Sequence, residues 1–421
     1  MLANSPVLSI CVPSRNRQKY FQETIKGLVA SSRMDVEFVF VDNSDDPTMM
    51  DAFITPYLAD PRITYIPSGE KVRPMVENWE VAATATRGQW VAFIGDDDYV
   101  DPDAAGLLKR IAAAEPDVDA VDWAKINYNW PDESRRPAPQ AIPLQTEITR
   151  IPKSLLKQRA FQWQSAKQTL VSGFSIYHSA ISRRLLDRIR QAYSGRFFEH
   201  PIVDYDSALK NIMLGEKFVH VRRPLSVLGV CPLSNSASLG NRDAADKIQK
   251  AFHQEHAVPM DAWDCYKDYP FTSRHGVTAC IGMVHHWFAK TYGYDFSGFE
   301  VNFVEACAIQ CNQSVNPEQF KLYADDYRQA FRSWKGGKYL KYFKPEFKPK
   351  AAETDFTGYW EPDLFVMERN TFSETATDFY RMVSGFLTPV EAMTVDFDSH
   401  RVNQTVRGAF RDIKRAANGH R

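Results

Sequence analysis

The stretch that decides the fold is Trp90–Tyr99, WVAFIGDDDY, an apolar run that leads into three consecutive aspartates, Asp96, Asp97 and Asp98. An unbroken apolar run that ends at a glycine predicts a buried strand. Like charges this close repel one another, so a buried cluster of them is costly unless a cation neutralises it. Mg²⁺ and Mn²⁺ prefer such oxygen ligands. The stretch therefore predicts a strand with a divalent-metal site at its carboxyl end, although an acidic turn before the next helix would use the same residues.

The residues around this stretch alternate between strand and helix patterns. Apolar runs predict strands at 8–12, 36–41 and 63–66, and helical spacing predicts helices at 20–30, 75–86 and 102–114. This alternation is typical of a parallel sheet covered by helices. In such an open sheet, ligands bind beyond the carboxyl ends of the strands, so we expect Asp42 and the three aspartates to face one crevice.

The rest of the chain suggests a second domain. Another strand is predicted at 119–128, and the proline-rich segment Pro131–Pro143 is expected to be a mobile loop. Beyond about Asn241 the pattern becomes helical and rich in aromatic residues. We therefore expect an α/β, Rossmann-like domain over residues 1–240 and a mainly helical accessory domain over 241–421, acting in acceptor recognition, assembly or membrane contact.

Four segments in a fixed order carry a resemblance to a known family. They are LSICVPSRNR at 8–17, FVFVDNS at 38–44, Asn78-Trp79-Glu80 with Gly88, and the strand that ends in three aspartates. Together they resemble family 2 glycosyltransferases of the GT-A fold, well over residues 6–110 and more weakly to about 240. The resemblance implies an enzyme that moves a sugar from a nucleotide-diphosphate donor, expected to be a UDP-sugar, to an acceptor hydroxyl with the help of Mn²⁺ or Mg²⁺.

The resemblance also implies roles for single residues, and we expect two kinds of contact. The donor-binding residues are Pro13, Ser14 and Arg15 in the loop after the first strand, Asp42 at the pyrimidine base, Asn78, and Asp96 at the ribose. Asp97 is implied as the metal ligand, with Asp98 behind it as a second metal or sugar contact. Gly95 stands where the commonest family pattern has its first acid, so which two of the three aspartates fill the motif stays open.

Inverting transfer needs a general base that takes the proton from the acceptor hydroxyl. In this family the base is an aspartate at the start of a downstream helix, and the segment FFEHPIVDYD at 197–206 resembles that region. Asp204 is the first candidate, with Asp206 or Glu199 in reserve. An aspartate before a helix can also serve as a plain N-cap, and this interpretation stays open for Asp204.

Other function classes fit less well. The chain has no Q-x-x-R-W motif of processive synthases, which favours addition of one sugar per encounter. A sugar-nucleotide pyrophosphorylase would need a glycine-rich loop after the first strand, whereas Pro13–Arg17 contains no glycine. A non-catalytic nucleotide- or glycan-binding module would have no reason to keep mutually repelling carboxylates such as Asp42, Asp97 and Asp204.

The charge balance and the cysteine content of the chain limit what the protein is expected to bind. The 421 residues carry 51 basic and 52 acidic side chains, so no overall field attracts a nucleic acid. The start of the chain lacks a signal-peptide pattern, which favours a cytoplasmic protein. The six scattered cysteines predict free thiols. We expect no zinc at Cys307 and Cys311, and His275, His285 and His286 are interpreted as ordinary helix positions.

The acceptor is expected to be a glycan or a lipid-linked sugar, in bacterial surface polysaccharide or glycan synthesis. The chain ends in a basic tail with Arg407, Arg411, Lys414, Arg415 and Arg421. Such a tail is usually a solvated helix face, but with a lipid-linked acceptor it would contact the anionic inner face of a membrane. Homo-oligomer formation also stays open.

Overall fold

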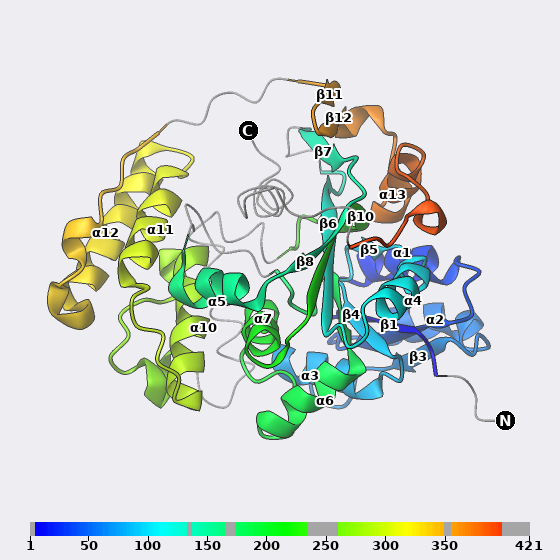
Figure 1. The fold of residues 1–421 in the computed structure, drawn as a ribbon, viewed down its shortest axis with the longest axis horizontal. Helices are drawn as coiled ribbons and strands as arrows, with labels where there is room; N and C mark the ends of the chain where they lie inside the picture. Colours follow the sequence, from blue (N-terminus) through cyan, green and yellow to red (C-terminus); the bar gives the residue numbers. More distant parts are fainter. Residues whose placement is uncertain (1–4, 133–136, 165–172, 235–259, 349–354, 398–421) are drawn as a thin grey trace.

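The structure is a computed structural model that describes residues 5–132, 137–164, 173–234, 260–348 and 355–397. These residues form a mixed α/β region around a curled sheet, with a helical region beside it (Figure 1). The predicted fold class is confirmed. The basic tail that the sequence singles out lies outside the described residues.

The central sheet brings the predicted strands together. Its order is β3 (Ile63–Ile66), β2 (Val36–Asp42), β1 (Leu8–Ser14), β4 (Trp90–Phe93), β9 (Ser179–Ser182), β6 (Ala120–Asn129), β10 (Phe218–Val230) and β5 (Tyr99–Val100), and β8 (Ile148–Ile151) also pairs with β10. The first four strands are parallel, with Ser14 opposite Asp42. The carboxyl ends of these strands therefore lie at one edge of the sheet.

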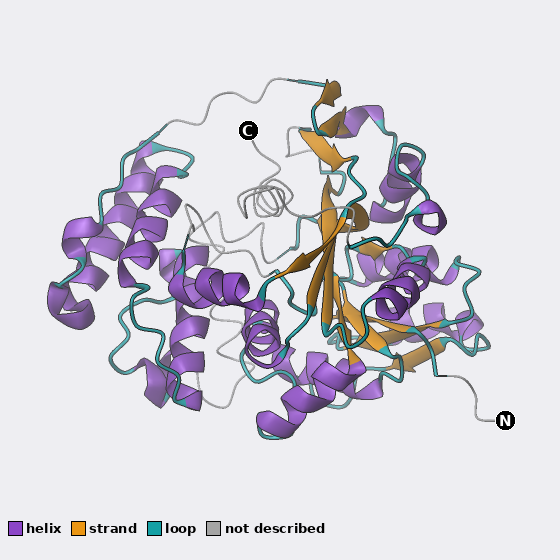
Figure 2. Cartoon of the chain, in the orientation of Figure 1, coloured by secondary structure: helices purple, strands orange, loops and turns teal. Residues whose placement is uncertain are grey.

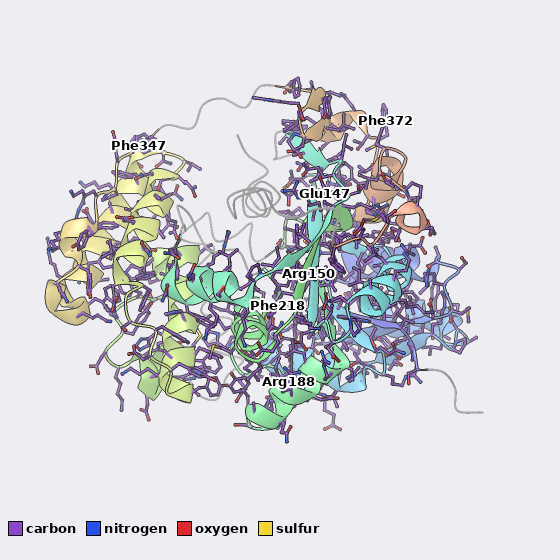
Figure 3. All side chains as sticks on the ribbon, viewed as in Figure 1. Glu147, Arg150, Arg188, Phe218, Phe347 and Phe372 are labelled. Carbon is purple, nitrogen blue, oxygen red and sulfur yellow. The ribbon has the colours of Figure 1, made fainter. Side chains whose placement is uncertain are left out.

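Helices cover both faces of this sheet, which is why its strands are apolar on both sides (Figure 2). On one face, α1 (Gln18–Val29) and α4 (Ala104–Ala114) pack on alternate residues of the strands, such as Ile10. On the other face, α3 (Met75–Ala85), α6 (Arg183–Ala192) and α7 (Val203–Leu214) pack on the remaining ones, such as Cys11. Arg188 of α6, labelled in Figure 3, donates to the Leu214 carbonyl at the end of α7 over 2.5 Å.

The helical region packs directly on the α/β region. It contains α5 (Lys153–Gln162), α10 (Val277–Tyr292), α11 (Glu300–Asn312) and α12 (Pro317–Ser333), and its aromatic side chains share one apolar core with α3, α6 and α7. None of the described helices is long and apolar enough to cross a membrane.

Apart from α13 (Ala376–Ser384), the remaining described helices are short. They are α2 (Thr48–Ile54) and the single-turn 3₁₀ segments η1 (Thr55–Tyr57), η2 (Met260–Ala262), η3 (Asp264–Tyr266), η4 (Ser273–His275), η5 (Trp334–Gly337), η6 (Leu340–Tyr342), η7 (Glu368–Asn370) and η8 (Val390–Ala392).

The end of the described chain returns to the α/β region. Strand β12 (Asp363–Met367) pairs with β11 (Gly358–Trp360) on one side and with β7 (Pro139–Pro143) on the other. Helix α13 (Ala376–Ser384) then buries its apolar side chains in the core beneath α1 and α4. Two expectations therefore need correction. Residues 139–143 form a strand rather than a mobile loop, and residues 358–393 belong with the α/β region rather than with a separate domain that starts at 241.

Candidate active site

Most of the predicted site residues lie at the edge of the sheet where the parallel strands end. Ser14 ends β1, Asp42 ends β2, and the three aspartates follow β4. The Ser14 hydroxyl donates to Asp96 Oδ2 over 2.6 Å. Pro13 lies one residue earlier in β1, opposite Val41. The parallel register thus places these residues together without any special loop.

Asp42 is a buried carboxylate, and one of its oxygens accepts no hydrogen bond from the described residues. Its Oδ1 accepts hydrogen bonds from the Ser44 backbone amide and from the Ser44 hydroxyl, at 3.1 Å and 2.6 Å. Its Oδ2 is buried and has no hydrogen-bond partner among the described residues, and burial raises the pKa of this carboxyl. A buried acceptor without a donor is costly. Asp42 is therefore suited to accept a hydrogen bond from a ligand.

Asn78 of α3 lies beside the turn after β2. Arg73 contacts both elements, since its backbone amide donates to Asn43 Oδ1 over 2.9 Å and its Nη1 lies 3.5 Å from Asn78 Oδ1. Sequence reasoning did not single out Arg73. Arg15 lies further out, and its Nη2 pairs with the exposed Asp45 at 3.3 Å.

Asp98 stabilises the loop after β4, and both of its carboxylate oxygens accept hydrogen bonds from the chain. Its Oδ2 accepts hydrogen bonds from the Gly95 amide, the Tyr177 hydroxyl and His178 Nε2 at 2.6, 2.7 and 2.9 Å, and its Oδ1 accepts one from the Gly229 amide at 2.7 Å. Burial alone would raise the pKa of Asp98, but the neighbouring His178 and these hydrogen bonds lower it. The expected role of Asp98 as a second metal or sugar contact does not fit this arrangement.

Asp96 and Asp97 share a cation that sequence reasoning did not assign, Arg17. Its guanidinium forms an ion pair with Asp96 at 2.6 Å and another with Asp97 at 3.4 Å. Asp97 Oδ2 also accepts a hydrogen bond from the Cys231 amide at 3.1 Å. Burial raises the pKa of Asp96 to about 7 in spite of Arg17, and burial raises the pKa of Asp97 as well. A nearby positive charge therefore stabilises the ionised forms of the two carboxyls.

A metal ion would find its ligand mainly in Asp97. Among the described residues, no three His, Cys, Asp or Glu side chains lie together in a way that would hold a metal ion. Asp97 is bound through its Oδ2, by the Cys231 amide and by Arg17, whereas donors of the chain bind both oxygens of Asp98, and Ser14 and Arg17 bind Asp96. Mg²⁺ is often bound through one or two carboxylates, substrate phosphates and water. The residues thus fit an ion that arrives with a diphosphate.

The predicted base lies on α7, and its two alternatives are already engaged. Asp206 is buried, accepts the backbone amides of Glu199 and His200 at 2.7 and 3.0 Å, and pairs with Lys210 at 3.0 Å. Glu199 accepts from Lys210 at 2.9 Å and from the Tyr292 hydroxyl. Neither is therefore placed to take a proton from a substrate.

Asp204 is the second residue of α7, in the first turn of the helix and partly exposed. The N-cap is Ile202, and no side chain caps the helix there. The N-cap interpretation of Asp204 therefore does not apply in this structure. Helix α7 is also tied to the loop behind Asp98, because the Ser207 hydroxyl accepts a hydrogen bond from the Ile176 amide at 3.3 Å.

Lys210 offers a test of how α7 is held. Its ammonium group is buried and binds both Asp206 and Glu199, so Lys210→Met should leave a buried carboxylate without its cation and lower the free energy of unfolding by about 3 kcal/mol. The control is Lys217→Met, whose partly exposed ammonium pairs with Glu115 and should cost less than about 1 kcal/mol. Urea unfolding at neutral pH measures both, and equal stabilities would show that Lys210 does not hold α7.

The sheet order, with carboxylates at the carboxyl ends of its parallel strands, is typical of α/β nucleotide-binding folds. Residues 9–186 match the family model described as "Glycosyl transferase family 2". The N-terminal part of this chain is therefore similar to family 2 glycosyltransferase domains, and the resemblance seen in the sequence is confirmed over these residues. No curated protein sequence matches the chain.

Comparison with solved structures finds matches at low identity and low TM-score. S. aureus TarS 1-349 in complex with UDP-GlcNAc has 13% identity and a TM-score of 0.43, with 80% of this chain and 89% of that chain covered. The mannosyltransferase PcManGT from Pyrobaculum calidifontis, in complex with GDP-Man and Mn2+, has 15% identity and a TM-score of 0.37, with 81% and 86% covered.

Proposed function

We propose that this protein is an inverting, non-processive glycosyltransferase that moves a sugar, of the hexosyl type, from a UDP-sugar to an acceptor hydroxyl. The observation that carries the proposal is the crevice at the ends of β1, β2 and β4, where the unpartnered oxygen of Asp42 and the charged pair Asp96 and Asp97 lie at one edge. The family 2 match over the same residues supports it.

The donor would lie along this edge. Asp42 Oδ2 is an acceptor without a donor, and the imide N–H of uracil is a suitable donor. Ser14 would face the ribose, and Asp96 would do so once Arg17 leaves its Oδ1. Pro13, Arg15 and Asn78 would line the nucleotide. A divalent ion held by Asp97 would neutralise charge on the diphosphate as it leaves.

In the proposed transfer step, Asp204 is the general base. The acceptor oxygen attacks the anomeric carbon and forms the new glycosidic bond, while the bond from that carbon to the diphosphate breaks and the nucleotide leaves with the electron pair. Asp204 takes the hydroxyl proton, because a carboxylate is a competent base once the oxygen begins to bond to carbon. Attack opposite to the leaving group inverts the anomeric configuration.

Several finer features stay predictions of the sequence. They are a glycan or lipid-linked acceptor, a place in bacterial surface polysaccharide or glycan synthesis, membrane contact at the inner face, and a homo-oligomer. The second candidate is a non-catalytic nucleotide-binding module of the same fold. A panel of nucleotide sugars screened by thermal shift with Mn²⁺, followed by measurement of nucleotide release with acceptor, separates the two, because a module would bind without release.

Asp42 offers a direct test of base recognition. Asp42→Asn should weaken uridine diphosphate binding by roughly 10- to 100-fold, because a hydrogen bond to a charged group is lost and an amide donor can face the base. The matched control is Asp45→Asn, an exposed carboxylate beyond the same strand, which should bind as the wild type does. Calorimetry with uridine diphosphate and adenosine diphosphate measures both variants. Equal affinities for the two nucleotides in the wild type would show that Asp42 does not recognise uracil.

A further inference from the structure

The acidic pair of the crevice already has a cation supplied by the chain. Arg17 Nη2 lies 2.6 Å from Asp96 Oδ1, and Arg17 Nε donates to Asp96 Oδ2 over 3.2 Å. Its Nη1 lies 3.4 Å from Asp97 Oδ2 and 3.7 Å from Cys231 Sγ. One guanidinium therefore bridges both carboxylates, which is the place where a divalent ion would neutralise them.

This contact differs from an ordinary surface ion pair. The Asp96 side chain is 0% exposed and that of Asp97 is 5% exposed, so water screens their charges poorly. Arg17 is 23% exposed and stands at the N-cap of α1, at the crevice end of that helix. Its side chain therefore contacts the buried acids and stays partly accessible to solvent.

A divalent ion on Asp97 would meet this guanidinium at close range. Two like charges in a poorly solvated site repel strongly, so the free enzyme opposes an added cation as long as Arg17 stays on the acids. A nucleotide diphosphate changes the balance, because its phosphate oxygens are strong partners for a guanidinium and for a metal ion alike.

We propose that Arg17 is the resident counter-ion of Asp96 and Asp97. In this role it opposes the binding of a divalent ion to Asp97 until the phosphates of a nucleotide diphosphate pair with its guanidinium. Metal and donor then bind to this site only together, and each raises the affinity of the other by the same factor. The inference rests on the proposed function, in which Asp97 is the metal ligand.

The test measures Mn²⁺ affinity without catalysis. Free Mn²⁺ is titrated by electron paramagnetic resonance into the full-length protein, with and without saturating uridine diphosphate. Arg17→Met should bind Mn²⁺ at least about tenfold more tightly than the wild type when no nucleotide is present, because a nearby positive charge is gone. Arg17→Lys, which keeps that charge, should bind as weakly as the wild type.

The control is Arg87→Met, the same change at an arginine that pairs with Glu37 near the opposite end of the parallel strands. It should leave Mn²⁺ affinity unchanged. If Arg17→Met does not fold by circular dichroism, the wild type decides the question: Mn²⁺ must raise uridine diphosphate affinity at least about tenfold, and absence of this coupling overturns the proposal.

Two other outcomes separate the inference from the function on which it rests. Unchanged Mn²⁺ affinity in folded Arg17→Met, with tight Mn²⁺ binding in the presence of uridine diphosphate, overturns the role of Arg17 and leaves the metal assignment intact. Absence of Mn²⁺ binding even with saturating uridine diphosphate overturns the metal assignment, and the role of Arg17 with it.

Discussion

Asp97→Asn should lower the rate of sugar transfer by roughly 10³-fold, because the variant loses the charge that would hold a divalent ion at the leaving diphosphate, a contribution of several kcal/mol. Its stability should change little. Asparagine still offers an oxygen to the Cys231 amide, and loss of one of two crowded negative charges relieves their repulsion. The measurement is nucleotide release with acceptor, beside thermal unfolding.

The neighbouring Asp98 provides the matched control. Asp98→Asn places an amide among four hydrogen-bond donors, so at least one donor loses its acceptor and the free energy of unfolding should fall by at least about 2 kcal/mol. The two substitutions thus distinguish a residue that would bind the metal ion, Asp97, from a residue that stabilises the loop, Asp98. Activity of Asp97→Asn equal to the wild type, or full wild-type activity in excess EDTA, would remove the metal ion from the reaction.

The sheet and the position of its acidic edge were predictable because they depend on local pattern. Strands β1, β2 and β4 are buried on both faces, so they are mostly apolar, and polar residues gather where each strand ends. Asp42 at the end of β2 and Asp96 shortly after β4 follow this rule. The rule needs no knowledge of distant contacts.

The different ion pairs of Arg15 and Arg17 were not predictable from local pattern. Both stand in the loop after β1, but Asn16 between them has a φ of 56°, in the left-handed region. This turn sends Arg15 toward Asp45 and Arg17 toward Asp96 and Asp97. The two arginines stand two residues apart, and residue type alone does not report which of them reaches the acids.

Contacts between distant segments account for most of the remaining differences. The groups that hold Asp98 include His178 and Gly229, which lie far along the chain and have no motif of their own. Strand β7 begins and ends with proline, which suggested a loop, yet it is an edge strand of the three-stranded sheet, where proline is tolerated. Its partner β12 follows more than two hundred residues later, so no local pattern connects the two.

The base assignment is the other prediction with a large effect. Asp204→Asn keeps the shape of the side chain but removes its ability to take a proton, so the rate of transfer should fall by roughly 10²- to 10⁴-fold. Affinity for uridine diphosphate should stay close to that of the wild type, because the other donor contacts remain. Loss of a negative charge in the first turn of α7 should cost only about 0.3–1 kcal/mol of stability.

Two further measurements make this test specific. The pH–rate profile of the wild type should fall on the acid side as the base becomes protonated, and the variant should lose that limb, which a purely structural defect would not produce. The comparison variant is Asp187→Asn on the neighbouring α6, expected to transfer sugar at the wild-type rate. Asp206 and Glu199 cannot readily replace Asp204, because Lys210 binds both of them. A wild-type rate in Asp204→Asn would therefore mean that no residue of this part of α7 acts as the base, and that the proton leaves by another route.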